Sequence, residues 1–568
     1  MPKLGIEGLS LEQWRHHVRV ALGEAPADLL LRNARVVNVA SGEVERASVA
    51  IVDGRIVGVG DYTDGADELD LAGAYLAPSF IDGHVHVESS LLWIDQFARA
   101  VVPHGTGAVV TDPHEIANVA GLAGIEALMA ASTDLPLGVF FTVPSCVPAS
   151  PMESPGAEMT PEVIGEALGL PRVVGLGELM NFPGVLAGDP EIYRKLVAPA
   201  HRRDGHAPGL GGRRLNAYAA SGPSSDHEST RLEEAAEKLR RGFVVMIREG
   251  STEQNLLELL PLVTDATYPR CCFASDDRDC ATLLHDGHID AVLRKAIGAG
   301  LDPIRAIRLA TLNTAEYWEL TGFGLVAPGY WANLVAFDRL EDIRPHLVLY
   351  RGAVVARDGR PSFEMRAMVP GFLLRTVQLA PLSREAIQLP AEPRMIAVGA
   401  IPGQIVTRKL EVEPKAVGGL AVADPERDLL KLIVVERHRA SGRVGVGLVH
   451  GFGLQRGALA SSIAHDAHNI VAVGVSDEDL LLAVTTVAEM QGGLAAVAAG
   501  EVLARLPLPV AGILSPEPLE KVVAAYERAE EAARALGSKV PSPFALLSFM
   551  ALSVIPEARV TDRGLVML

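Results

Sequence analysis

The sequence is poor in cysteine, with only Cys146, Cys271, Cys272 and Cys280 in 568 positions. So few thiols in so long a chain exclude the disulfide framework that small secreted proteins use. No pair has the C-x-x-C spacing, which argues against a zinc site built from thiolates. We therefore expect small buried thiols and a protein of the reducing cytoplasm.

Long hydrophobic runs are also missing. The most apolar stretch begins at Gly492, but Glu501, Arg505, Pro507 and Pro509 interrupt it, and a membrane span needs about 18 uninterrupted apolar residues. The first twenty residues lack the apolar core of a signal peptide. The 49% hydrophobic content and the mean hydropathy of +0.23 instead suggest large buried parallel sheets. We expect no membrane partner.

The chain has fewer positive than negative side chains. It contains 51 Lys and Arg residues and 70 Asp and Glu residues, for a net charge of −19. An acidic surface argues against binding to nucleic acid or to an anionic membrane. It favours an enzyme that acts on a small neutral or cationic molecule.

The pattern of apolar, β-branched and turn-forming residues changes several times along the chain. Short β-branched runs with turns such as Asp53-Gly54 form two separate stretches, which we expect to pair into one small sandwich. Between them, apolar strands alternate with helical stretches over the length of a (β/α)8 barrel. The predicted fold is α/β: a (β/α)8 TIM barrel inserted into a composite β-sandwich domain, followed by an additional C-terminal α/β domain. The expected segments are 1–27 (helical), 28–77 (first sandwich part), 78–325 (barrel), 326–385 (second sandwich part) and 386–568 (C-terminal domain).

Histidines and carboxylates follow the predicted barrel strands, at the ends where barrel active sites are built. His84 and His86 close the first strand, and alternate side chains of a strand point the same way. Later strands are followed by Asp112, His114 and Glu115, by Glu178, by His206, by His227 and Glu228, and by Asp276 and Asp277. A lone histidine is more often a packed or surface residue, but this ordered series suits a divalent first-row ion.

These motifs resemble the adenine deaminase family of the amidohydrolase superfamily. The resemblance is carried in the barrel by FIDGHVHVESS, VTDPHEIANVAG, GLGELMNFPGV, DGHAPGL, ASGPSSDHE, FASDDR and DGHIDAVLRKAI. It continues in SSIAHDAHNIVAVGVSDEDL, MQGGLA and VIPEARVTDRGL, and so spans nearly the whole chain. An H-x-H pair alone would be weak, whereas DPHEIANV and AHDAHNIVAVG are far more specific.

The resemblance implies a site. Its metal ligands would be His84, His86, His114, Glu178 as a bridging carboxylate, His206, His227 and Asp276. Asp276 would hold or accept the proton of the water, with Asp277 as its alternative, and Glu228 or Glu115 would be the acid that donates protons. Substrate contacts would come from Glu88, Ser89, Ser90, Glu249 and Asp277.

The implied reaction is hydrolysis of adenine to hypoxanthine and ammonia by a binuclear centre of Mn²⁺ or Fe²⁺, with Zn²⁺ as an alternative. Hydrolysis of a cyclic amide is a competing interpretation, but Glu178 stands where such enzymes usually carry a lysine. An inactive metal-binding scaffold is disfavoured by the full ligand set. The cluster His465, Asp466, His468 and Asn469 could hold metal, but substrate enclosure or a domain interface is favoured. We expect a homo-oligomer, such as a dimer.

Overall fold

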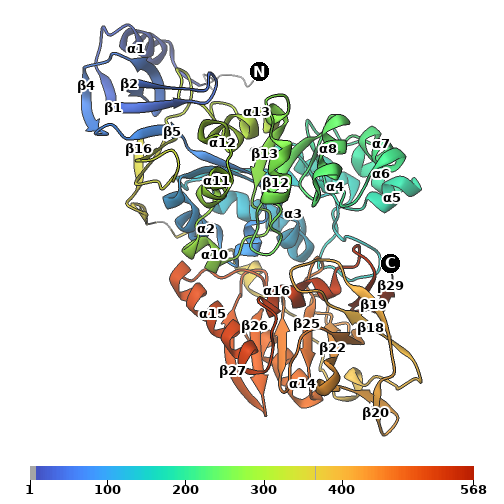
Figure 1. The fold of residues 1–568 in the computed structure, drawn as a ribbon. Coiled ribbons are helices and arrows are strands. Elements are labelled where there is room, and N and C mark those ends of the chain that lie inside the picture. Colours follow the sequence, from blue (N-terminus) through green and yellow to red (C-terminus); the bar gives the residue numbers. More distant parts are fainter. Residues whose placement is uncertain (1–7, 365, 568) are drawn as a thin grey trace.

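The computed structural model describes residues 8–364 and 366–567, so residues 1–7 of the expected helical segment lie outside the described part. Three units follow one another in Figure 1: a β module carrying α1, a barrel, and a C-terminal domain. No helix among the described residues is long and apolar enough to cross a membrane. All four cysteines are buried and free.

Helix α1 (Leu11–Ala21) begins at a capping box. The Ser10 side chain accepts a hydrogen bond from the Gln13 backbone, and the Gln13 side chain accepts one from the Ser10 backbone. This exchange satisfies two backbone donors that a helix start otherwise leaves unpaired. The helix packs on the edge of the first sheet, where His17 Nε2 lies 3.1 Å from Asp53 Oδ2.

The first sheet is built from both flanks of the barrel. Strand β5 pairs with β1 on one side and with β14 on the other, so that segments far apart in sequence form one nine-stranded sheet. The β2–β3 turn uses Asp53 and Gly54 in left-handed conformations, as a tight hairpin requires. The strands are β1 (Ala27–Asn38), β2 (Glu43–Val52), β3 (Arg55–Gly60), β4 (Gly65–Asp70), β5 (Tyr75–Pro78), β14 (Leu334–Phe337), β15 (Leu347–Tyr350), β16 (Ala353–Arg357) and β17 (Arg360–Pro361).

The middle unit is a barrel of eight parallel strands in chain order. Its two sheets, β6 to β10 and β11 to β13, join where Ser224 N donates to Arg203 O at 3.0 Å. The ring closes where Asp276 N donates to His84 O, also at 3.0 Å. The strands are β6 (Phe80–Val85), β7 (Thr106–Thr111), β8 (Gly138–Val143), β9 (Val173–Leu179), β10 (Arg203–Gly205), β11 (Ser225–Asp226), β12 (Val244–Arg248) and β13 (Cys271–Ala274).

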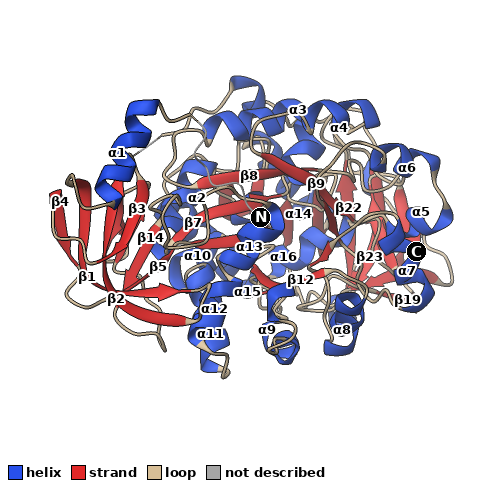
Figure 2. Ribbon diagram, turned by 90° about the horizontal axis from the view of Figure 1, so that it is seen from above, coloured by secondary structure: helices blue, strands red, loops and turns tan. Residues whose placement is uncertain are grey.

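Helices surround these strands. In Figure 2, α3 and α4 lie on one side of the barrel and α8, α9 and α11 on the opposite side. The barrel helices are α2 (Ile94–Val101), α3 (His114–Ala131), α4 (Pro161–Ala167), α5 (Phe182–Ala187), α6 (Pro190–Leu196), α7 (Gly212–Ala220), α8 (Leu232–Arg240), α9 (Leu256–Leu259), α10 (Cys280–His285), α11 (Ile289–Gly298), α12 (Pro303–Leu309) and α13 (Leu312–Trp318). Strands covered on both sides are buried throughout, which explains the hydrophobic composition.

The C-terminal domain is an eight-stranded sheet in which every pair is antiparallel except β18 with β23. Alternate residues face opposite sides: Ala460 and Ala472 pack with α14, and Val471 and Leu494 belong to the core shared with α15 and the barrel. The strands are β18 (Met395–Gly399), β19 (Arg408–Val412), β22 (Leu429–Val435), β23 (Val444–His450), β24 (Ala458–Ser461), β25 (Ile470–Gly474), β26 (Gly493–Ala498) and β27 (Glu501–Pro507). The helices are α14 (Asp477–Glu489), α15 (Leu519–Ala535) and α16 (Pro543–Ser548), and two hairpins comprise β20 (Lys415–Val417), β21 (Leu420–Val422), β28 (Ala558–Thr561) and β29 (Gly564–Met567).

This domain covers the mouth of the barrel. Backbone hydrogen bonds of 2.8 Å run from Ser515 N to Leu91 O and from Trp93 N to Ser515 O. On another side, the Ser154 hydroxyl donates to Asp562 Oδ2 at 2.6 Å. The carboxyl ends of the barrel strands therefore face protein instead of open solvent.

Candidate metal centre and active-site cavity

Five histidines and two carboxylates converge at the carboxyl ends of six barrel strands. β6 supplies His84, with His86 directly after it, and β9 supplies Glu178. His206 and His227 come directly after their strands, and His114 and Asp276 follow theirs within three residues. All seven are at least 92% buried, so their polar atoms depend on one another or on a bound ion.

His84, His86 and Asp276 form the first group of this centre. The two Nε2 atoms are 3.1 Å apart. Asp276 Oδ1 lies 3.1 Å from His86 Nε2 and 3.5 Å from His84 Nε2. Asp276 has a φ of 56°, a left-handed conformation that aspartate tolerates better than most residues.

Hydrogen bonds fix which nitrogen of each strand histidine is free. His84 Nδ1 lies 2.7 Å from Asp204 Oδ2, and His86 Nδ1 lies 2.8 Å from Asp112 O. A proton on each Nδ1 satisfies these acceptors and leaves a lone pair on each Nε2. Two lone pairs 3.1 Å apart repel, and a cation between them removes the repulsion. The donor set therefore fits a divalent metal ion.

Glu178 lies at the centre of the second group. Its Oε2 is 2.5 Å from His206 Nδ1 and 3.4 Å from His227 Nε2. Its Oε1 is 3.3 Å from both His86 Nε2 and His114 Nδ1. Each carboxylate oxygen thus faces a different pair of imidazoles, as a carboxylate shared by two ions would. Burial would raise the pKa of Glu178, but His206 and the other imidazoles hold it well below its ordinary value.

Glu228 and Arg248 lie beside these ligands. Arg248 Nη1 donates to Asp276 Oδ2 at 2.8 Å and also contacts Glu228 Oε1. Glu228 Oε1 lies 3.8 Å from both His206 Nδ1 and His227 Nε2. The arginine therefore couples the two acids across the barrel mouth, and its pKa is raised because their charges outweigh the effect of burial.

The structure does not bring Glu249 to the centre. Successive side chains at the end of β12 point in opposite directions, so Arg248 points inward. The Glu249 carboxylate instead accepts a hydrogen bond from Leu256 N at 3.1 Å and contacts Lys295 Nζ.

Glu88, Ser89 and Ser90 lie in a short 3₁₀ turn after β6. Glu88 Oε1 accepts a hydrogen bond from Ile116 N at 3.1 Å, which ties the turn to the start of α3. Ser89 donates to Asp277 Oδ1, and Ser90 donates to Val87 O at 2.6 Å. Burial and the nearby Glu115 charge raise the pKa of Glu88 to about 7. Through these contacts, the turn holds neighbouring residues of the site in place and contributes little to the wall of the cavity over the metal centre.

A cavity opens over the metal centre and combines a few polar groups with apolar side chains, as small-molecule sites commonly do. Its floor carries the ligands together with Arg248 and Glu253. Burial raises the pKa of Glu253 to about 7. Its other wall comes largely from the C-terminal domain, through Ile405, His465, Asp466, Phe549, Leu552 and Ile555.

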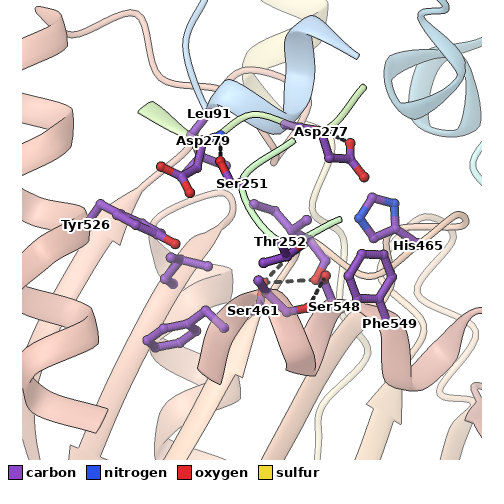
Figure 3. A pocket seen from close by; sticks show the side chains of 15 residues that line it. Leu91, Ser251, Thr252, Asp277, Asp279, Ser461, His465, Tyr526, Ser548 and Phe549 are labelled. Atoms are coloured by element: carbon purple, nitrogen blue, oxygen red, sulfur yellow. Dashed lines mark hydrogen bonds between the residues drawn. The ribbon is translucent and has the colours of Figure 1, made fainter. Parts of the chain in front are cut away.

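A second cavity adjoins the first and lies between the barrel and the C-terminal domain. Both share Asp277, His465 and Phe549 as lining residues. Figure 3 shows Asp277 and His465 close to each other at one end of it. The His465 ring stacks on Phe549 at 4.9 Å, so these two side chains separate the two spaces.

Some residues of the site were not identified from the sequence. Arg248, Glu253 and Asp204 follow or end barrel strands, as the ligands do, and that position was the available signal. His465 and Asp466 were expected to help enclose the substrate or form a domain interface, but no sequence pattern shows that their distant loop reaches Glu115. Burial lowers the pKa of His465, but the Glu115 carboxylate outweighs it and raises that pKa to about 9.

Comparisons with known proteins agree with this arrangement. Residues 75–361 match the amidohydrolase family, and residues 404–568 match the adenine deaminase C-terminal domain. An adenine deaminase of Dehalococcoides mccartyi (strain CBDB1) is 53% identical over 97% of this chain and 96% of its own. Adenine deaminase 2 of Carboxydothermus hydrogenoformans is 46% identical over 97% of both chains. A crystal structure of an adenine deaminase has a TM-score of 0.46 and 17% identity, and covers 58% of this chain and 100% of its own. On the strength of its sequence relatives, this chain belongs to the adenine deaminase family of amidohydrolases.

Proposed function

We propose that this protein hydrolyses adenine to hypoxanthine and ammonia at a binuclear metal centre. The observation that carries the proposal is the convergence of His84, His86, Glu178, His206, His227 and Asp276 beneath a cavity whose other wall comes from the C-terminal domain. The near-full-length similarity to proteins named adenine deaminase supports the substrate.

The ligands divide between two ions. His84, His86 and Asp276 would hold one, and His206 and His227 the other, with Glu178 between them. A bound divalent ion would supply a Lewis acid that brings the pKa of a water towards neutrality. Imidazole and carboxylate donors without thiolate suit Mn²⁺ or Fe²⁺, and also accept Zn²⁺.

The protein's own groups move the protons. Asp276 accepts a proton from the attacking water, whose oxygen bonds to C6 of adenine. Glu228 donates a proton to the ring nitrogen beside C6, and Asp276 passes the proton taken from water to the amino group as the C–N bond breaks and ammonia leaves. The C6 hydroxyl gives up its proton to Glu228 as the carbonyl of hypoxanthine forms. Arg248 touches both acids, so it holds their carboxylates in place throughout.

The cavity excludes water and positions the purine. Its apolar lining from the C-terminal domain, Phe549, Leu552 and Ile555, suits the faces of a flat aromatic base. Asp277, beside Asp276, lines both cavities and is placed to contact the polar edge of the base.

Ammonia release from a panel of substrates tests this proposal. The metal-loaded protein should deaminate adenine and leave adenosine, cytosine, guanine and dihydroorotate unchanged. Turnover of dihydroorotate would support cyclic amide hydrolysis instead. Activity on adenosine but not adenine would contradict the substrate.

Two further expectations belong with this function. The four buried free cysteines support a reducing compartment such as the cytoplasm. A homo-oligomer, such as a dimer, should appear as a mass near 120 kDa in light scattering, about twice the 60.1 kDa of one chain. A mass of one chain at all concentrations would contradict it.

A further inference from the structure

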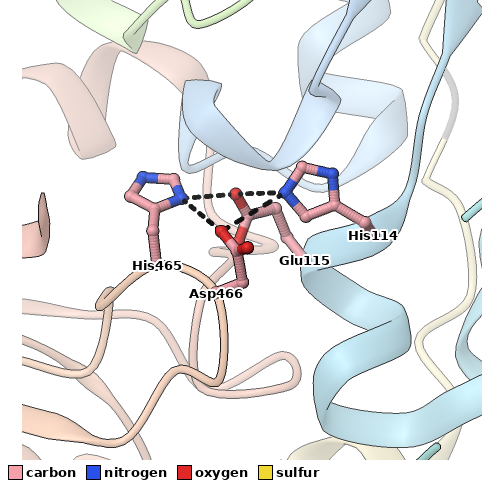
Figure 4. Close-up of side chains that lie close together, drawn as sticks. All are labelled: His114, Glu115, His465 and Asp466. Atoms are coloured by element: carbon pink, nitrogen blue, oxygen red, sulfur yellow. Dashed lines mark ion pairs between the residues drawn. The ribbon is translucent and has the colours of Figure 1, made fainter. Parts of the chain in front are cut away.

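A second cluster of potential ligands spans the junction of the two domains, and we call it the junction cluster. His114 and Glu115 begin α3, and His465 and Asp466 lie in the loop between β24 and β25. The four side chains point towards one another in Figure 4. One nitrogen or oxygen of each lies within 4.8 Å of the other three.

Glu115 Oε1 is the closest of these atoms to the others. It lies 2.7 Å from His465 Nδ1 and 3.2 Å from His114 Nε2. Asp466 Oδ1 is 3.8 Å from both of these nitrogens. Two nitrogens and two oxygens thus surround one point, from four residues that are distant in sequence.

These contacts are not satisfied hydrogen bonds. Glu115 Oε1 and Asp466 Oδ2 have no hydrogen-bond partner, although both residues are 2% exposed. Buried carboxylate oxygens in folded proteins are normally hydrogen-bonded, because the loss of solvation is costly. A cation among the four side chains would supply the missing interaction.

A fifth residue orients Glu115 for this role. His468 Nδ1 accepts a hydrogen bond from Ala464 N at 3.3 Å, which places the ring proton on Nε2. That Nε2 donates to Glu115 Oε2 and leaves Oε1 for another partner. Histidine–carboxylate pairs of this kind commonly fix the ligands of a metal site.

The ring of His114 separates this point from the barrel centre. Its Nδ1 faces Glu178 Oε1 at 3.3 Å, whereas its Nε2 faces Glu115 and Asp466. The junction cluster therefore has its own set of donors and does not use His84, His86, His206, His227 or Asp276.

We propose that His114, Glu115, His465 and Asp466 form a third cation site, which binds a first-row divalent ion and ties the C-terminal domain to the barrel. Two imidazoles and two carboxylates suit Mn²⁺, Fe²⁺ or Zn²⁺. Each domain supplies one histidine and one carboxylate, so neither domain holds the complete ligand set. The inference depends on these contacts and not on adenine being the substrate.

Anomalous diffraction from crystals of the full chain, grown with Mn²⁺, locates the ion directly. The expected map has a peak among His114 Nε2, Glu115 Oε1, His465 Nδ1 and Asp466 Oδ1, separate from the peaks in the barrel centre. Peaks confined to the barrel centre at saturating Mn²⁺ would overturn the proposal. Adenine turnover is measured separately, so a failure of the substrate assignment would not affect this result.

Metal content in solution gives a second test. After equilibration with Mn²⁺, Asp466→Asn and His465→Gln should each contain one equivalent per chain less than the unmodified protein. The matched controls Asp265→Asn and His285→Gln change exposed residues and should lose none. Retention of the full metal content by both folded junction variants, checked by circular dichroism, would refute the site. The diffraction result holds whether or not these variants fold.

Discussion

Single residues in the barrel mouth control which atoms are free to bind metal. Asp204 and the Asp112 carbonyl each occupy the Nδ1 of one strand histidine. Both Nε2 atoms then face Asp276, which also accepts a hydrogen bond from Arg248. Asp276 therefore lies where a metal-binding oxygen and a proton acceptor are both needed.

Asp276→Asn should lower kcat for adenine by at least about 100-fold, because an amide cannot accept the water's proton. The other ligands remain, so metal content should stay near that of the unmodified protein. Steady-state kinetics and elemental analysis measure the two quantities. Asp277→Asn is the matched control, because Ser89 holds that carboxylate, and it should retain more activity. If Asp277→Asn were inactive and Asp276→Asn active, the two roles would be exchanged.

Asp204→Asn should weaken Mn²⁺ binding by about 10- to 100-fold, because the carboxylate orients His84 and increases its basicity. Competition with a chelator of known affinity measures the change. Asp82→Asn is a suitable control: this carboxylate is also buried in the barrel, but it bonds to the Ser275 hydroxyl and to the His84 backbone and not to the side chain of a proposed ligand. Equal Mn²⁺ affinity in Asp204→Asn and the unmodified protein would contradict this role.

At the scale of elements, α15 joins the C-terminal sheet to the barrel. Its residues Leu519 and Val522 belong to the large core shared by both units. Glu530 lies on the buried side of the same helix, 6% exposed, and neither of its carboxylate oxygens has a hydrogen-bond partner. Burial raises the pKa of Glu530 to about 7, so this element carries a destabilising charge at neutral pH.

Glu530→Gln should raise the melting temperature at pH 8 and leave it nearly unchanged at pH 4. The folded pKa of about 7 lies above the ordinary 4.5, so the folded state binds the proton more tightly. Stability is therefore lost as pH rises from about 4.5 to 7, by on the order of 2–3 kcal/mol. Calorimetry across this range checks the effect. Glu531→Gln, at the exposed neighbour, should show no such pH dependence, and the same response in both variants would contradict the argument.

Element patterns explain how much the sequence could predict. The H-x-H pair, the strand-end acids and the regular alternation of strands and helices allowed the barrel to be predicted and its candidate ligands to be named, because these signals are local. The direction in which a side chain points at a strand end is harder to predict. Arg248 points inward, whereas Glu249, which was expected to contact substrate, points away. The mostly antiparallel pairing of the C-terminal sheet was also missed, because buried strands of either kind have similar composition.

At the scale of the whole molecule, the site is complete only when the units are assembled. The barrel supplies the proposed metal ligands, whereas Ile405, His465 and Phe549 line the cavity from the C-terminal domain. No local pattern could place these residues over the barrel, because their positions depend on packing between segments far apart in sequence, such as the contact of His465 with Glu115.

Removal of metal should therefore affect stability as well as turnover. Dialysis against a chelator should abolish adenine deamination and lower the melting temperature, because clustered buried ligands lose their counter-charge. An ion present at about 100 times its Kd stabilises the folded state by roughly 2.7 kcal/mol. Calorimetry before dialysis, after it, and after Mn²⁺ is restored measures the effect. Full turnover in metal-free protein, or an unchanged melting temperature, would contradict this expectation.

The nine-stranded sheet has a consequence for how the protein is made. Strand β5 emerges from the ribosome long before its partner β14. The two strands pair antiparallel, with Tyr75 opposite Phe337. Translation of the intervening roughly 250 residues takes on the order of 10 to 50 seconds at usual rates. Throughout that interval, one edge of the nascent N-terminal sheet has no neighbour, and such edges are prone to pair with other chains. Because the barrel is inserted between two paired strands, correct folding of this protein depends on the speed of synthesis and on protection of the exposed strand edge by chaperones.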